Sequence, residues 1–129
     1  MAKDTLHFKV KEFACKCGCG KDDIDQRVMN MAQTIRDAIK VPIHVNSGCR
    51  CDTYNESQPV GGLKGSYHTL GLAADLSCSL GAKALFVAVV NLKAKGKLPD
   101  LQYAIWYGKK NFVHIDCGKV RNNFFEVRP

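Results

Sequence analysis

The chain has 129 residues, of which 46% are hydrophobic and 24% are charged, values that are ordinary for one globular domain that buries its own core. We therefore expect a single domain over residues 1–129, with a Cys-rich N-terminal arm at about residues 8–20. No apolar run is long enough to cross a bilayer, and the first residues lack the apolar segment of a signal peptide. The net charge of +7 favours an anionic partner, such as nucleic acid, a bacterial wall polymer or a membrane surface. Most of the lysines are scattered along the chain, however, which is typical of an ordinary solvated surface.

In the N-terminal half, residues 6–14 begin with alternating apolar positions, which predicts either a short strand or an extended arm. The Cys- and Gly-rich run that follows, to Gly20, predicts a loop. Apolar residues then recur at three and four positions, which predicts a helix over residues 25–39 with a core-facing stripe. A β-rich alternation predicts a strand over residues 41–46, and the polar, Gly-bearing residues 49–65 predict a long surface loop.

The C-terminal half alternates between strand and helix signals. Residues 72–77 predict a second strand, and residues 80–92 predict a helix despite several valines. Residues 101–107 and 112–117 predict two strands joined as a hairpin through a Gly-containing turn. The tail from residue 121 gives no clear signal.

The strongest chemical signal is a set of metal-ligand side chains. His68 and Asp75 lie seven positions apart around a run of small residues, and His114 lies on the later predicted strand. Neutral imidazole and carboxylate suit zinc, and three protein ligands leave a fourth position open for water, as in catalytic zinc sites. A buried Asp75 would also need a partner, which a metal supplies. His7 and His44 lack such a context, and we interpret them as packed or surface residues.

Asp116 follows His114 by two positions on the same predicted strand, so the two side chains share one face. The carboxylate could therefore orient His114 or carry a proton during catalysis, and both roles stay open at this point.

Seven cysteines are many for this length, and five of them fall in two short runs. If the two runs face each other, they form disulfides or hold a second, structural metal. The C-x-C spacing differs from the C-x-x-C of zinc ribbons and slightly favours disulfides or free thiols. The cysteines concerned are Cys15, Cys17, Cys19, Cys49 and Cys51.

Taken together, these residues resemble a known family of zinc peptidases: the D-alanyl-D-alanine carboxypeptidases, grouped with phage L-alanyl-D-glutamate endolysins and sharing their metal fold with the hedgehog signalling domain. The resemblance covers most of the chain, from about residue 8 to residue 118. It is carried by Ser47-Gly48-x-Arg50, Asn55, Gly61-Gly62, Ser66-x-His68-x-x-Gly71-x-Ala73-x-Asp75 and Val113-His114-Ile115-Asp116.

The resemblance implies that His68, Asp75 and His114 bind one catalytic zinc ion. It implies that Arg50 holds a substrate carboxylate or polarises the scissile carbonyl, a role that suits its forked guanidinium, and that Ser66 lies at the substrate. It also implies a small α+β fold, in which helices pack on one side of an antiparallel sheet that carries the zinc site. The expected substrates are peptidoglycan stem peptides, cleaved by a monomer without nucleic acid or membrane insertion.

The chain departs from the family at Asn111, since many members carry Glu or Asp three positions before the last histidine. Either Asp116 takes over from that acid, or the register of the turn differs, or the chain is an inactive wall-binding or virion module. A nucleic-acid-binding zinc protein is less favoured, because no basic recognition helix accompanies the cysteines. Without a signal peptide, we expect synthesis in the cytoplasm and release to the cell wall, as for a phage or prophage product.

Overall fold

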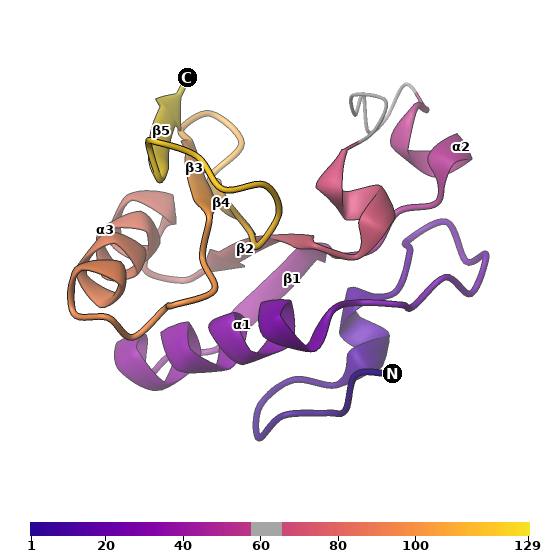
Figure 1. Ribbon diagram of the computed structural model, residues 1–129, viewed down its shortest axis with the longest axis horizontal. Coiled ribbons are helices and arrows are strands. Elements are labelled where there is room, and N and C mark those ends of the chain that lie inside the picture. Colours follow the sequence, from indigo (N-terminus) through magenta and orange to yellow (C-terminus); the bar gives the residue numbers. More distant parts are fainter. Residues whose placement is uncertain (58–65) are drawn as a thin grey trace.

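A mixed five-stranded sheet organises the fold, with strand order β1-β2-β4-β3-β5. The computed structural model describes residues 1–57 and 66–129 (Figure 1). The expected α+β class is confirmed, with antiparallel pairing throughout except that β5 runs parallel to β3. The strands are β1 (Ile43–Ser47), β2 (Ala73–Cys78), β3 (Tyr103–Tyr107), β4 (Phe112–Asp116) and β5 (Phe125–Arg128).

The predicted first helix is α1, Gln26–Ile39. It begins at Asp25, whose carboxylate accepts a hydrogen bond from the backbone N–H of Arg27, as expected of a helix cap. The apolar stripe faces inward, because Val28 and Ile35 are fully buried. The helix ends at Lys40, which adopts a left-handed conformation with φ of 61°.

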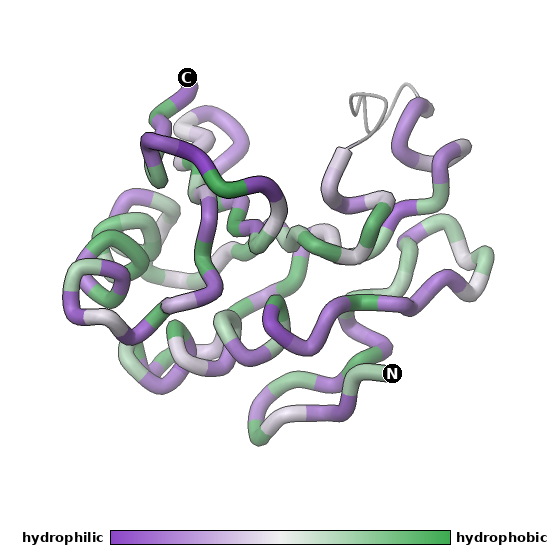
Figure 2. Tube along the Cα trace, viewed as in Figure 1, coloured by the Kyte–Doolittle hydropathy of each residue, from purple (hydrophilic) through white to green (hydrophobic). Residues whose placement is uncertain are grey.

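The second long helix, α3 (Ala82–Ala94), is more uniformly apolar, as the green trace in Figure 2 shows. It contacts β2, β3 and β4 as well as α1. Phe86 of this helix stacks edge-on against Phe125 of β5, with ring centroids 5.8 Å apart. The two long helices therefore lie on one side of the sheet and leave its other face for polar side chains.

Two expectations for local structure need correction, and one strand was not expected. Residues 6–14 form neither a strand nor a wholly extended arm, because they contain the 3-10 helix η1 (Val10–Phe13). The predicted loop at 49–65 contains a short helix, α2 (Asp52–Asn55), while Gly61 and Gly62 lie outside the described residues. The tail supplies β5, which the sequence did not predict, because the strand is short and pairs with β3 from a distance.

The second 3-10 helix, η2 (Tyr67–Leu70), precedes β2 and contacts it. Gly71 follows with φ of 71°, and a side chain there would meet the carbonyl oxygen of Asp23 at 2.3 Å. Glycine is therefore required at this turn by both conformation and space. Within the described residues, no helix is both long and apolar enough to cross a membrane.

Candidate metal centre

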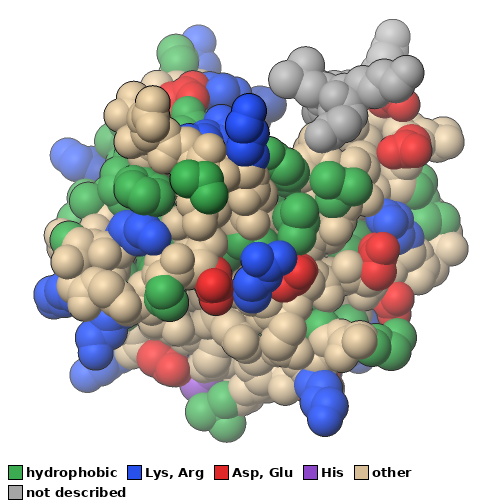
Figure 3. All heavy atoms as spheres, viewed as in Figure 1, with side chains coloured by type: hydrophobic (Ala, Val, Ile, Leu, Met, Phe, Trp, Pro, Cys, Tyr) green, Lys and Arg blue, Asp and Glu red, His purple; other side chains and the backbone are tan. Residues whose placement is uncertain are grey.

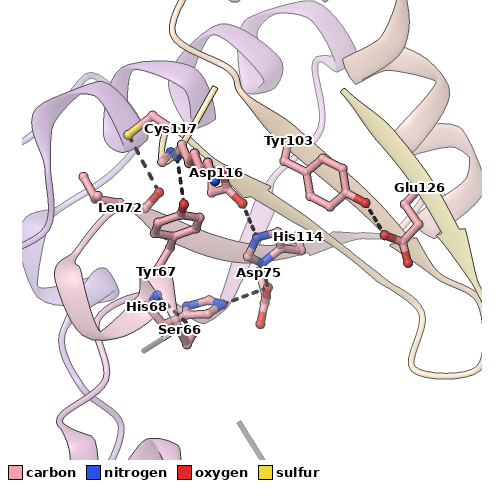
Figure 4. Close-up of polar contacts among 12 residues, drawn as sticks. Ser66, Tyr67, His68, Leu72, Asp75, Tyr103, His114, Asp116, Cys117 and Glu126 are labelled. Atoms are coloured by element: carbon pink, nitrogen blue, oxygen red, sulfur yellow. Dashed lines mark hydrogen bonds and ion pairs between the residues drawn. The ribbon is translucent and has the colours of Figure 1, made fainter. Parts of the chain in front are cut away.

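The register of the sheet brings together the two candidate ligands that lie on strands. Asp75 of β2 is the direct cross-strand partner of His114 of β4, so both side chains project from the face that the long helices leave open. Asp75 Oδ1 lies 3.0 Å from His114 Nδ1 and 3.3 Å from Nε2 of His68, which η2 carries to the same place (Figure 4).

These three residues fit a zinc ion by donor type and by spacing. Their ligand atoms all lie within 4.8 Å of one another. Zinc with N and O ligands at about 2.0–2.2 Å in tetrahedral geometry separates the ligand atoms by about 3.3–3.6 Å. The distances of 3.0 and 3.3 Å from Asp75 to the two imidazoles are close to this range. The predicted ligands His68, Asp75 and His114 thus converge.

Each imidazole is oriented by a hydrogen bond on its other nitrogen. His68 Nδ1 donates to the carbonyl oxygen of Gly48 at 2.8 Å, which turns Nε2 toward Asp75. His114 Nε2 lies 2.8 Å from Asp116 Oδ2, which turns Nδ1 toward Asp75. Metal-binding histidines commonly have such partners, because these fix the ring and its tautomer.

Opposite charges pair within this group of residues. Burial raises the pKa of Asp75, but the neighbouring His68 and His114 outweigh it and hold that pKa well below its usual range. Burial likewise lowers the pKa of His114, but its hydrogen bonds to Asp116 and Asp75 prevail and raise it to about 9. The carboxylate of Asp75 that favours this proton lies beside the nitrogen that would bind a metal ion, so a proton and a metal ion would compete for His114.

Arg50 is held tightly against this site. Its Nε donates to Ser47 Oγ at 2.9 Å, its Nη1 to Asn55 Oδ1 at 3.1 Å and its Nη2 to Asp75 Oδ2 at 3.0 Å. The side chain is only 12% exposed. A guanidinium carries five N–H donors, so within the described part of the chain these three contacts leave two for a ligand. The motif residues Ser47 and Asn55 thus act by fixing Arg50.

The neighbouring predicted residues have clear local contacts. Asp116 is 1% exposed, and its second oxygen, Oδ1, accepts from the backbone N–H of Gly118 at 3.2 Å. Ser66 caps η2, where its Oγ accepts from the N–H of His68 at 3.2 Å. The contacts of Asp116 favour an orienting role, and the substrate role of Ser66 stays a prediction.

Asn111 does not face the metal centre. It adopts a left-handed conformation with φ of 56° in the turn before β4. Its Oδ1 accepts a hydrogen bond from the backbone N–H of Ala82 at 2.9 Å, at the start of α3. Gly81, the residue before α3, has no side chain to cap the helix, and Asn111 supplies that cap from another element.

The remaining histidines lie elsewhere, as expected. His7 packs near α1, with Nδ1 2.8 Å from the side-chain nitrogen of Gln33, and His44 is an exposed residue of β1. By contrast, sequence reasoning missed Glu126. This residue of β5 pairs with Ile105 of β3, which in turn pairs with His114, so Glu126 projects from the same face as the metal ligands. The alternation of residues 124–128 was the available signal.

A small α+β domain in which two histidines, a buried carboxylate and an arginine converge beside one open sheet face has the arrangement of a mononuclear metallohydrolase. A comparison with protein-family models agrees with this class: the model described as Peptidase M15 matches residues 6–116. The chain therefore belongs to the peptidase M15 family, whose members are zinc-dependent metallopeptidases. None of the curated proteins compared with the chain matches it.

Proposed function

We propose that this protein is a zinc peptidase that hydrolyses amide bonds in the stem peptides of bacterial peptidoglycan. The observation that carries the proposal is the convergence of His68, Asp75 and His114 beside Arg50. Three protein ligands leave a coordination position for water or substrate, as catalytic rather than structural zinc requires. The family assignment supports peptidase chemistry, and stem peptides offer the carboxylates that an arginine recognises.

The charge of the surface is compatible with such a substrate. The chain carries a net charge of +7, and an anionic wall polymer would be attracted to it. Figure 3 shows lysine and arginine side chains spread over the visible face, interspersed with acidic ones. Scattered charge of this kind favours general attraction to an extended polyanion over a single recognition patch. Release to the wall as a phage or virion product remains part of the proposal.

The chain's own residues have separable tasks in the reaction. His68, Asp75 and His114 would hold the zinc ion, which when bound supplies a Lewis acid for the amide carbonyl and lowers the pKa of water. Arg50 would use its two remaining N–H donors to bind a substrate carboxylate or the oxygen of the scissile carbonyl. Asp116 would keep Nδ1 of His114 directed at the site.

Proton transfer requires a carboxylate that solvent and substrate can reach. Among the strand residues on the metal-bearing face, the carboxylates are Asp75, Asp116 and Glu126. Asp75 is a candidate ligand and Asp116 is buried, whereas the side chain of Glu126 is 32% exposed, accepts a hydrogen bond from Tyr103 and forms an ion pair with Arg128. These differences favour Glu126 over the predicted Asp116 as the group that accepts and returns the proton.

The test is hydrolysis of purified muropeptides by the zinc-loaded protein, with products identified by mass spectrometry. Loss of a terminal alanine would identify a carboxypeptidase, and cleavage between alanine and glutamate an endopeptidase. His68→Ala, which removes a ligand, should bind no catalytic zinc and give no product. If the wild-type protein binds zinc at this site but gives no product, the alternative of a non-catalytic wall-binding or virion module is correct.

A further inference from the structure

A second group of potential ligands lies apart from the metal centre, in the N-terminal Cys-rich loop. Cys15, Cys17 and Cys19 come from this loop, and Cys51 comes from the residue after Arg50. Their sulfur atoms all lie within 4.8 Å of one another, although Cys51 is 32 positions beyond Cys19. All four are free thiols. We propose that these cysteines bind a second zinc ion, which has a structural role.

The spacing of the sulfur atoms matches a metal site better than disulfides. Cys15 Sγ lies 3.4 Å from Cys17 Sγ and 3.9 Å from Cys51 Sγ, and Cys17 Sγ lies 3.7 Å from Cys51 Sγ. Four sulfurs at about 2.3 Å from a tetrahedral zinc ion are separated by about 3.8 Å. A disulfide would require about 2.0 Å and would serve only one pair at a time. One ion satisfies all four sulfurs together.

The backbone around the cluster is arranged for sulfur ligands. The N–H of Cys51 is directed at Cys15 Sγ at 3.4 Å, and the N–H of Tyr54 at Cys51 Sγ at 3.4 Å. Such donors stabilise metal-bound thiolates by offsetting their negative charge. Gly18 has φ of 83° and donates its N–H to the carbonyl of Cys15 at 3.3 Å, so the loop turns back and brings its sulfurs together.

The other cysteines lie outside the cluster. Cys49, which the sequence grouped with Cys51, is fully buried in the core, and its N–H donates to the carbonyl of Phe13 at 2.7 Å. Cys117 Sγ contacts the carbonyl of Leu72 at 3.7 Å. Cys78 is half-buried and not among the clustered cysteines. The structure thus supplies matched thiols for controls.

The proposed ion would fasten the N-terminal loop to the segment that carries Arg50. That segment is already close-packed, because a side chain at Gly48 would meet the carbonyl oxygen of Phe13 at 2.5 Å. Four protein ligands leave no open coordination position, which is the character of a structural site. The second ion would therefore stabilise the position of Arg50 without entering the reaction.

The experiment is metal analysis of the protein purified under reducing conditions with zinc supplied. We expect two zinc ions per chain in the wild type, one in His68→Ala, one in Cys17→Ser and in Cys19→Ser, and two in the control Cys78→Ser. Because Cys17 and Cys19 are exposed, their replacement by serine leaves the core intact. X-ray absorption of His68→Ala should show sulfur neighbours alone, at about 2.3 Å from zinc.

Cobalt provides a second measurement that does not depend on counting bound zinc ions. Titration of the metal-free wild type with Co²⁺ should give thiolate-to-cobalt charge-transfer absorption, which His68→Ala keeps and Cys17→Ser weakens. One zinc ion in the wild type with no change in the cysteine variants would overturn the proposal. So would an intact mass lower than that of seven free thiols by the hydrogens lost to disulfides. Neither result bears on peptidase activity at the first site.

Discussion

Asp116 and Asp75 contact opposite nitrogens of the same imidazole, that of His114. Asp75 Oδ1 lies 3.0 Å from Nδ1, and Asp116 Oδ2 lies 2.8 Å from Nε2. The alternation of β4 places Asp116 and His114 on one face, and the pairing with β2 places Asp75 there as well. Asp75 is thus positioned to bind the same metal ion as His114, while Asp116 is positioned to orient the imidazole ring.

The first prediction concerns Asp116→Asn. We expect zinc affinity to fall about 10–100-fold, because the orienting hydrogen bond to His114 loses its charge. Activity should recover at saturating zinc if Asp116 only orients the ring. Competition with a chromogenic chelator measures the affinity, and Asp37→Asn on the exposed face of α1 is the control. A variant that binds zinc normally but stays inactive would instead assign the proton transfer to Asp116.

The second prediction concerns Glu126→Gln. We expect kcat to fall about 10²–10⁴-fold with no loss of bound zinc, because the variant keeps the shape of the side chain but cannot accept a proton. Tyr103→Phe, which removes the hydroxyl that donates to Glu126, should have a smaller effect. Steady-state kinetics with a defined muropeptide, together with metal analysis, checks both. Unchanged kcat in Glu126→Gln would exclude the residue from proton transfer.

The third prediction concerns Asn111, which stands where the family resemblance led us to expect an acidic residue. Asn111→Ala should destabilise the protein by about 1 kcal/mol, because α3 loses the cap on the N–H of Ala82. Asn111→Asp should keep that cap and should not raise activity, since the side chain faces the helix rather than the metal centre. Urea denaturation and muropeptide hydrolysis measure the two effects. An increase of activity in Asn111→Asp would show that this position does reach the substrate.

The sequence predicted the parts of the site that depend on local pattern. The alternation of apolar and polar residues predicted the strands β2 and β4, which carry Asp75 and His114. The family motif then distinguished His68 and His114 from His7 and His44. Their cross-strand pairing then follows from a sheet with one buried face, because a shift of one residue would bury the charged side chains against the helices.

Contacts between distant segments were not predictable in the same way. Asn111 caps a helix that begins 29 positions earlier, and no local pattern marks such a pair. Cys51 rather than Cys49 joins the sulfur cluster, because Cys49 turns into the core beside Phe13. Glu126 reaches the site face only through the parallel pairing of β5 with β3. In each case, tertiary packing determines which distant residue makes the contact.

The last prediction concerns the pH dependence of the metal-free protein. The pKa of His114 rises from 6.5 to about 9 on folding, because its hydrogen bonds to Asp116 and Asp75 outweigh burial. The protonated ring therefore stabilises the fold fully below pH 6.5, by on the order of 3 kcal/mol, and this contribution is lost as the pH rises through about 9.

Urea denaturation between pH 6 and about pH 10, in the presence of a chelator and a reductant, measures this loss. His114→Gln cannot take up the proton, so the difference in stability between wild type and variant should shrink as the pH rises. Zinc must displace the same proton, and its affinity for the site should therefore increase over this range. If the difference in free energy of unfolding between wild type and His114→Gln stayed constant with pH, His114 would already be neutral in the folded protein without metal.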